Sequence, residues 1–163
     1  MIVVLFGVSG SGKTTLGQIL ASELGWSFYD ADDFHSSENI DKMRGGVPLT
    51  DEDREPWLQR LRALIERCLA TDENAVIACS ALRRSYRERL RLTSEVRFIY
   101  LRGTPQLIAG RLKARRGHFM IADLVPTQFD TLEEPKSDEE TIAIDIAHPP
   151  HAILNEIRQK LAL

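Results

Sequence analysis

Cysteine is scarce in the 163-residue sequence, which contains only Cys68 and Cys79. One lies in a helical pattern and the other ends an apolar run, so the two define no disulfide framework of the kind found in small secreted domains. Long apolar stretches are also missing, because the run Ile2–Phe6 is too short for a signal peptide or a membrane span. We expect a cytoplasmic protein with reduced thiols and no membrane segment.

An excess of positive charge is absent as well. The chain has 21 lysine and arginine residues and 24 aspartate and glutamate residues, which give a formal net charge of -3 at pH 7. Binding to a nucleic-acid backbone calls for a basic surface, so we expect no nucleic-acid partner. Basic residues are nevertheless concentrated between positions 83 and 116. This uneven distribution favours a local site for a small anion.

The alternation of segments along the chain predicts the fold class. Short runs rich in β-branched and aromatic residues alternate with longer helical patterns, which is typical of a parallel sheet covered by helices on both faces. A chain of this length fits one domain, spanning residues 1–163. We expect a three-layer α/β fold with five parallel strands: Ile2–Phe6, Ser27–Asp30, Ala75–Cys79, Val96–Leu101 and Thr141–Ile146. The first and fourth runs are continuously apolar, as in central strands.

Capping signals locate two of the helices. Thr50 and Asp53 resemble a capping box, and apolar residues recur at helical spacing from Trp57 onward. Thr104 and Pro105 predict the N-cap and first turn of a helix after the fourth strand. Both helices therefore begin directly after turns of the predicted α/β fold.

A glycine-rich loop follows the first strand and decides the general chemistry. It matches the pattern G-x-x-x-x-G-K-[ST], whose inward-pointing N–H groups, together with a helix N-terminus, bind phosphates. Lys13 is expected to reach the β- and γ-phosphates of ATP, and the Thr14 hydroxyl is expected to hold Mg²⁺. The predicted ATP-binding residues of this segment are Gly7, Val8, Ser9, Gly10, Ser11, Gly12, Lys13, Thr14 and Thr15.

Motors, switches and kinases all contain such a loop, so absent motifs help to separate them. No Asp-Glu pair ends the run Ala75–Cys79, where hydrolytic ATPases carry one, and no Asn-Lys-x-Asp guanine-reading motif occurs. These absences favour a kinase that phosphorylates small molecules. A nucleotide-binding regulatory module with little turnover is the alternative from a different functional class.

Two carboxylates follow the second strand, where open α/β sheets bind their ligands. We assign Asp32 as the base that accepts the proton of the attacking hydroxyl, and Asp30 to the water shell of the metal. The alternative is that an aspartate here merely caps the next helix, which Ser36 can also do. Asp33 is assigned to solvent or to capping. His35 is either a ligand of a substrate hydroxyl or a surface residue.

Arginines supply the remaining candidates. Arg54, Arg83 and Arg84 are candidates for a substrate anion, because a guanidinium donates paired hydrogen bonds to a carboxylate or phosphate. Arg111 and Arg115 are candidates for ATP and begin a basic segment that we interpret as a mobile lid at about 115–126. A solvated charged helix is the alternative for that segment.

Several blocks together resemble the gluconokinase family, within the P-loop kinases related to shikimate kinase and nucleoside monophosphate kinases. They run in family order across nearly the whole chain: Gly7–Thr14, Tyr29–His35, Pro48–Arg54 with Pro56–Leu58, Cys79–Leu82, Gly117–Met120, Gln128–Phe129 and Leu132–Glu133.

The resemblance implies Mg²⁺-dependent and ATP-dependent phosphorylation of the 6-hydroxyl of gluconate, and it implies a homodimer. The residues that match the substrate side of the family are Asp32, His35, Arg54, Arg83, Arg84 and His118. A kinase for another small acid or for a nucleotide is the alternative of the same class, because pocket residues and not the fold select the acceptor.

Overall fold

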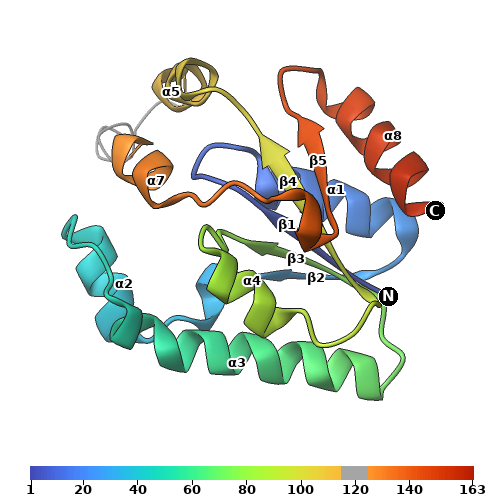
Figure 1. The fold of residues 1–163 in the computed structure, drawn as a ribbon, viewed down its shortest axis with the longest axis horizontal. Helices are drawn as coiled ribbons and strands as arrows, with labels where there is room; N and C mark the ends of the chain where they lie inside the picture. Colours follow the sequence, from blue (N-terminus) through green and yellow to red (C-terminus); the bar gives the residue numbers. More distant parts are fainter. Residues whose placement is uncertain (115–124) are drawn as a thin grey trace.

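A computed structural model describes residues 1–114 and 125–163 of the chain (Figure 1). In this part the strands form one parallel five-stranded sheet in the order β2-β3-β1-β4-β5. The expected α/β class and the parallel sheet are confirmed, although β4 extends one residue further than expected and β5 ends one residue earlier. The strands are β1 (Ile2–Phe6), β2 (Ser27–Asp30), β3 (Ala75–Cys79), β4 (Val96–Arg102) and β5 (Thr141–Asp145).

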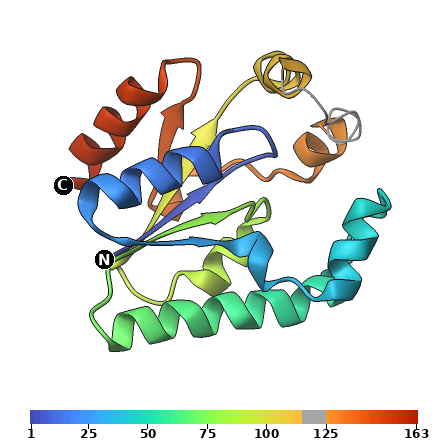
Figure 2. The ribbon, with the colours of Figure 1, turned by 180° about the vertical axis from the view of Figure 1, so that it is seen from behind.

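Helices cover both faces of the sheet, as Figures 1 and 2 show from opposite sides. One face packs against α3 and α4, and the other packs against α1, α5 and α8. The α-helices of the described ranges are α1 (Lys13–Leu24), α2 (Ser37–Arg44), α3 (Asp51–Ala70), α4 (Arg84–Leu90), α5 (Pro105–Ala114), α7 (Val125–Thr131) and α8 (Pro150–Leu161). The same ranges contain two short 3₁₀ helices, η1 (Ala31–Phe34) and η2 (Ser137–Glu139).

The central position of β1 follows from its composition. Ile2, Val4 and Phe6 belong to the core beneath α3, whereas Val3 and Leu5 belong to the core beneath α1. All of them are fully buried, because alternate residues of a strand point to opposite faces and both faces are covered here. The expected place of the first strand in the middle of the sheet is confirmed.

The predicted helix starts are also observed. Thr50 and Asp53 form a reciprocal capping box at the start of α3, and the Thr104 hydroxyl accepts the Leu107 N–H at 3.2 Å before α5. Each bond satisfies a backbone donor that the first turn of a helix leaves without a partner. In the residues that the structure covers, no helix is long and apolar enough to cross a bilayer.

Candidate active site

The glycine-rich loop connects β1 to α1 at the carboxyl edge of the sheet. Gly7 has φ 149°, and a Cβ there would lie 2.9 Å from the backbone oxygen of Leu101. Gly12 has φ 94° and is the N-cap of α1. A side chain at either position would force the loop to shift, because L-residues rarely adopt these φ values. The loop therefore has the tight path that lets a backbone approach phosphates closely.

Lys13 folds back over this loop. Its Nζ donates hydrogen bonds of 3.0 Å to the carbonyl oxygens of Gly7 and Val8. At the other side of the loop, a Cβ on Gly10 would lie 3.0 Å from Leu112 of α5, so α5 packs directly on the loop. The loop backbone, the N-terminus of α1 and the Lys13 ammonium form a donor set suited to nucleotide phosphates.

Thr14 and Asp30 meet at the point predicted for the metal. The Thr14 hydroxyl donates to Asp30 Oδ2 at 2.8 Å, and Asp30 Oδ1 accepts the Asp32 N–H at 3.0 Å. Hydroxyl and carboxylate oxygens are the hard donors that Mg²⁺ prefers. Among the described residues, no group of three or more His, Cys, Asp or Glu side chains is placed to hold a metal. Mg²⁺ bound here would therefore take most of its ligands from phosphate and water.

Asp32 lies in η1, two residues after the N-cap Asp30. Desolvation by the surrounding protein, and next the charge of Asp30, raise the pKa of the Asp32 carboxyl, although its side chain still reaches solvent. The positive charge of Lys13 acts on this pKa in the opposite direction. A carboxyl with a raised pKa is a stronger base for a hydroxyl proton.

Two residues near Asp32 cap helices: Asp30 caps η1 and Ser36 caps α2. Asp30 is the N-cap of η1, and its side chain accepts the Asp32 N–H. The Ser36 hydroxyl accepts the Asn39 N–H at 3.2 Å and so caps α2. Asp30 thus has a structural role as well as its contact with Thr14, and Asp33 is exposed.

His35 packs flat against Trp57, with ring centroids 4.7 Å apart and an interplanar angle of 5°. Burial, and next the positive charges of Arg54 and Arg60, lower the pKa of His35 to about 4, so its ring is neutral at pH 7. Its Nδ1 is buried and has no hydrogen-bond partner in the described structure. A neutral imidazole has one nitrogen that donates a hydrogen bond and one that accepts, so the ring can bind a hydroxyl without carrying a charge.

Arg54 and Arg83 are joined through residues that sequence patterns did not single out. Arg54 Nη1 donates to the Tyr86 hydroxyl at 3.3 Å, and that hydroxyl donates to Asp51 Oδ1. Asp51 Oδ2 accepts from Arg83 Nη1 at 2.7 Å. Neither Asp51 nor Tyr86 was assigned to the site from the sequence, because an exposed aspartate among other acidic residues and a tyrosine in a helical pattern give no signal of this kind. Arg54 and Arg83 are therefore linked through Tyr86 and Asp51, and the charge of Arg54 also acts on His35.

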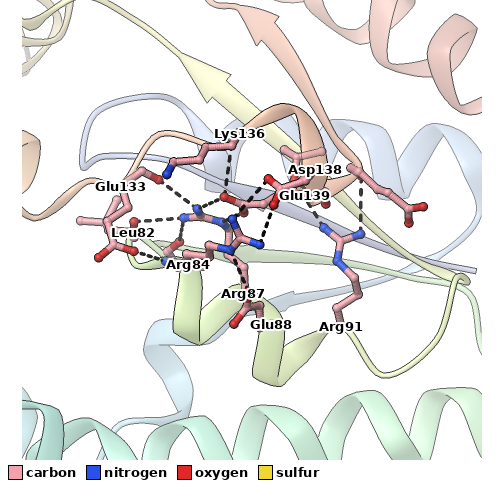
Figure 3. Close-up of polar contacts among 12 residues, drawn as sticks. Leu82, Arg84, Arg87, Glu88, Arg91, Glu133, Lys136, Asp138 and Glu139 are labelled. Atoms are coloured by element: carbon pink, nitrogen blue, oxygen red, sulfur yellow. Dashed lines mark hydrogen bonds and ion pairs between the residues drawn. The ribbon is translucent and has the colours of Figure 1, made fainter.

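Arg84 points elsewhere. Its guanidinium pairs with Glu88 and with Asp138 (Figure 3). It also lines a surface cavity of about 190 Å³ together with Arg87 and other charged residues. No hydrogen bond within the described ranges joins the Arg84 side chain to the other candidate residues. The structure thus gives Arg84 a role in holding α4 to the segment after α7.

The remaining candidates concern the nucleotide. Arg111 of α5 donates to the carbonyl of Ile146, just after β5, and Thr15 is exposed in the first turn of α1. Arg115 and His118 lie outside the described residues, as does the predicted lid up to residue 124. Positions 125 and 126 belong to α7.

Comparisons with known proteins identify the family of the chain. The family model for shikimate kinase matches residues 9–161. A probable gluconokinase of Xenopus tropicalis is 44% identical over 96% of this chain and 91% of its own length.

Two solved structures are similar at 42 to 44% identity. The sugar kinase of Janibacter sp. HTCC2649 superposes with a TM-score of 0.92, is 44% identical and covers 99% of this chain and 94% of its own. The gluconokinase of Sinorhizobium meliloti 1021 superposes with a TM-score of 0.82, is 42% identical and covers 98% and 94% respectively. The chain therefore belongs to the gluconokinase family, within the wider group of shikimate kinase-like proteins.

Proposed function

We propose that the protein transfers the γ-phosphoryl group of ATP to the 6-hydroxyl of gluconate, forming 6-phosphogluconate and ADP. The observation that carries this proposal is the position of Asp32. It lies in η1, whose N-cap Asp30 accepts from Thr14 beside the glycine-rich loop and whose C-cap is His35. A base in that place lies between a phosphate donor site and an acceptor site, which a regulatory module does not need.

On the nucleotide side, the backbone of the glycine-rich loop and Lys13 bind the phosphates, and Thr14 with Asp30 hold Mg²⁺. Bound Mg²⁺ supplies positive charge that neutralises the phosphate oxygens during transfer. Arg111 and Arg115 are proposed to contact ATP. These residues lower the barrier mainly by positioning the phosphates and stabilising their charge, since phosphoryl transfer requires little covalent chemistry from the protein.

On the acceptor side, Asp32 hydrogen-bonds the hydroxyl and accepts its proton while the new O–P bond forms and the bond to the ADP oxygen breaks. His35 and His118 are proposed to bind acceptor hydroxyls. Arg54 and Arg83 are proposed to bind the acceptor carboxylate through charge-assisted hydrogen bonds. Arg84 is the weakest member of this set, because its guanidinium is engaged by Glu88 and Asp138.

Measuring ADP release with a panel of acceptors tests the proposal. The panel contains gluconate, a related sugar acid, the neutral polyol sorbitol, shikimate and a nucleoside monophosphate. We expect release that depends on gluconate and Mg²⁺, with 6-phosphogluconate as the product. Faster release with another acid or with the nucleotide would assign the alternative kinase activity. ATP binding without release on any acceptor would indicate the regulatory module.

The family resemblance also leads us to propose a cytoplasmic homodimer. Light scattering after gel filtration tests the oligomeric state. A mass near 18.4 kDa, that of one chain, would contradict a dimer.

A further inference from the structure

The side chain of Gln128 reaches into the glycine-rich loop from α7. Its Oε1 accepts the backbone N–H of Ser9 at 3.1 Å and lies 3.3 Å from the Ser9 hydroxyl, which also donates to it. The two residues are 119 positions apart in sequence. Because the acceptor is a neutral carboxamide, the contact fixes a loop donor without adding negative charge beside the phosphates.

The helix that carries Gln128 is firmly attached at its other end. The Glu133 N–H donates to the Leu82 carbonyl at 2.9 Å, and the Glu133 carboxylate accepts the Arg84 N–H at 2.7 Å. The chain just beyond α7 is thus bound to the start of α4. Since the Gly7 N–H donates to the Ser80 carbonyl at 3.3 Å, this anchor and the glycine-rich loop rest on the same end of β3.

A buried arginine reinforces the anchor (Figure 3). Arg87 is fully buried and donates to the carbonyls of Ala81, Leu82 and Glu133 at 2.9 to 3.1 Å. It also binds both carboxylate oxygens of Glu139, at 2.8 and 3.0 Å. Such a satisfied buried network restricts motion of the segments that it joins. The chain that follows α7 is therefore held in place, and with it the helix from which Gln128 contacts Ser9.

The orientation of the carboxamide follows from its partners. Ser9 offers an N–H donor and a hydroxyl, so the oxygen of Gln128 must face the loop and its nitrogen must point away. Within the described ranges, that nitrogen makes no hydrogen bond.

We propose that Gln128 is a positioning residue of the nucleotide site: by accepting from the N–H and the hydroxyl of Ser9, it holds the glycine-rich loop in the shape in which its other N–H groups bind the phosphates of ATP. The inference rests on the proposed kinase function, but it concerns the nucleotide side alone. Loss of the contact frees the first half of the loop to leave its binding shape. The expected effect is about a tenfold loss of ATP affinity, the order of one to two neutral hydrogen bonds.

Two variants of Gln128 and one control test this role. Gln128→Met keeps the length of the side chain and helix propensity but cannot hydrogen-bond Ser9. Gln128→Glu keeps an accepting oxygen but brings a negative charge next to the phosphates. Asp130→Asn, at an exposed position of the same helix, is the matched control. ATP binding is measured by calorimetry without acceptor, and kcat and KM are then measured with gluconate.

Gln128→Met is expected to weaken ATP binding and to lower kcat/KM for ATP about tenfold, with KM for gluconate unchanged. Gln128→Glu is expected to keep the melting temperature and to weaken ATP binding still further. In a Ser9→Ala background the effect of Gln128→Met should shrink, because the hydroxyl part of the contact is already lost.

Three results would overturn the proposal. One is ATP binding by Gln128→Met equal to that of the wild type, whatever its melting temperature. Another is wild-type binding by Gln128→Glu, which would place the side chain away from the phosphates. The third is a rise in KM for gluconate at constant ATP affinity. If the wild type does not phosphorylate gluconate while Gln128→Met still weakens ATP binding, the proposed acceptor is wrong and this inference stands.

Discussion

The Thr14 hydroxyl donates a 2.8 Å hydrogen bond to Asp30 Oδ2 and so ties the first turn of α1 to the end of β2. The two residues are 16 positions apart in sequence, yet together they provide the hydroxyl and carboxylate oxygens at the predicted metal position. The bond also joins the phosphate side of the site to η1, where Asp32 lies.

Asp30→Asn should therefore change the response to Mg²⁺. The amide keeps an oxygen for hydrogen bonding but loses the negative charge that attracts the metal and its water shell. We expect the Mg²⁺ concentration for half-maximal activity to rise by about 10-fold or more, as for other residues around metal ligands. Asp33→Asn is the control and should respond as the wild type. An unchanged Mg²⁺ requirement in Asp30→Asn would remove this residue from the metal site.

Tyr86→Phe tests how Arg54 is held. Since the Tyr86 proton goes to Asp51, the oxygen lone pairs face Arg54, and removal of the hydroxyl frees the guanidinium. We expect KM for gluconate to rise about five- to tenfold, the size of one hydrogen bond to a charged group, with KM for ATP unchanged.

Tyr29→Phe is a matched control for this variant. Tyr29 also lies beneath an arginine, with the Arg67 Cζ 5.5 Å from its ring, and it also donates to a carboxylate, that of Glu73. It belongs to β2 and has no contact with Arg54 within the described ranges. An equal rise in KM for gluconate in Tyr86→Phe and Tyr29→Phe would mean that the hydroxyl of Tyr86 contributes only to stability.

The neutral state of His35 predicts a pH dependence of folding. The folded-state pKa is about 4, below the ordinary value of 6.5, so the unfolded chain binds a proton in this interval that the folded chain excludes. The stability contributed by neutral His35 is complete above about pH 6.5 and is lost as the pH falls toward 4. The melting temperature of the wild type should fall more between pH 7 and 5 than that of His35→Phe, which retains an aromatic ring against Trp57. Parallel curves for the two proteins would contradict the lowered pKa.

The buried pair of Arg87 and Glu139 predicts a stability effect. Burial alone would raise the pKa of Glu139, but the hydrogen bonds and the charge of Arg87 outweigh burial and hold this pKa below its ordinary value. Arg87→Met leaves a buried carboxylate without its partner and should lower the free energy of unfolding by about 3 to 5 kcal/mol. In urea unfolding, the double variant Arg87→Met/Glu139→Leu should recover much of this loss. No recovery would mean that Arg87 acts mainly through its bonds to backbone carbonyls.

The sheet could be predicted because each strand carries its own signal. The first residue of every expected strand is the first residue of an observed strand, because each run of β-branched and aromatic residues stands apart from the helical patterns on either side of it. The glycine-rich loop could be recognised for a similar reason, because its glycines, Lys13 and Thr14 follow one another within one short segment. Such features need no knowledge of distant contacts.

Contacts between elements were harder to predict. Arg83 and Arg84 are adjacent, but Arg83 is the N-cap of α4 and Arg84 is its first residue, so their side chains leave in different directions. One meets Asp51 and the other meets Asp138. The roles of Tyr86 and Gln128 likewise depend on how α3 meets α4 and how α7 meets the loop, and no local pattern encodes either.

The most direct measurement is the comparison of Asp32→Asn with Asp33→Asn in nucleotide affinity and in kcat with ATP and gluconate. Asn keeps the size and an oxygen of the carboxylate but cannot accept the hydroxyl proton. Asp32→Asn should bind ATP nearly as the wild type and lose roughly 10² or more in kcat, while Asp33→Asn should change little. The assignment of Asp32 as the base would be contradicted by a large loss of kcat in Asp33→Asn. It would also be contradicted if Asp32→Asn lost ATP affinity but kept its kcat.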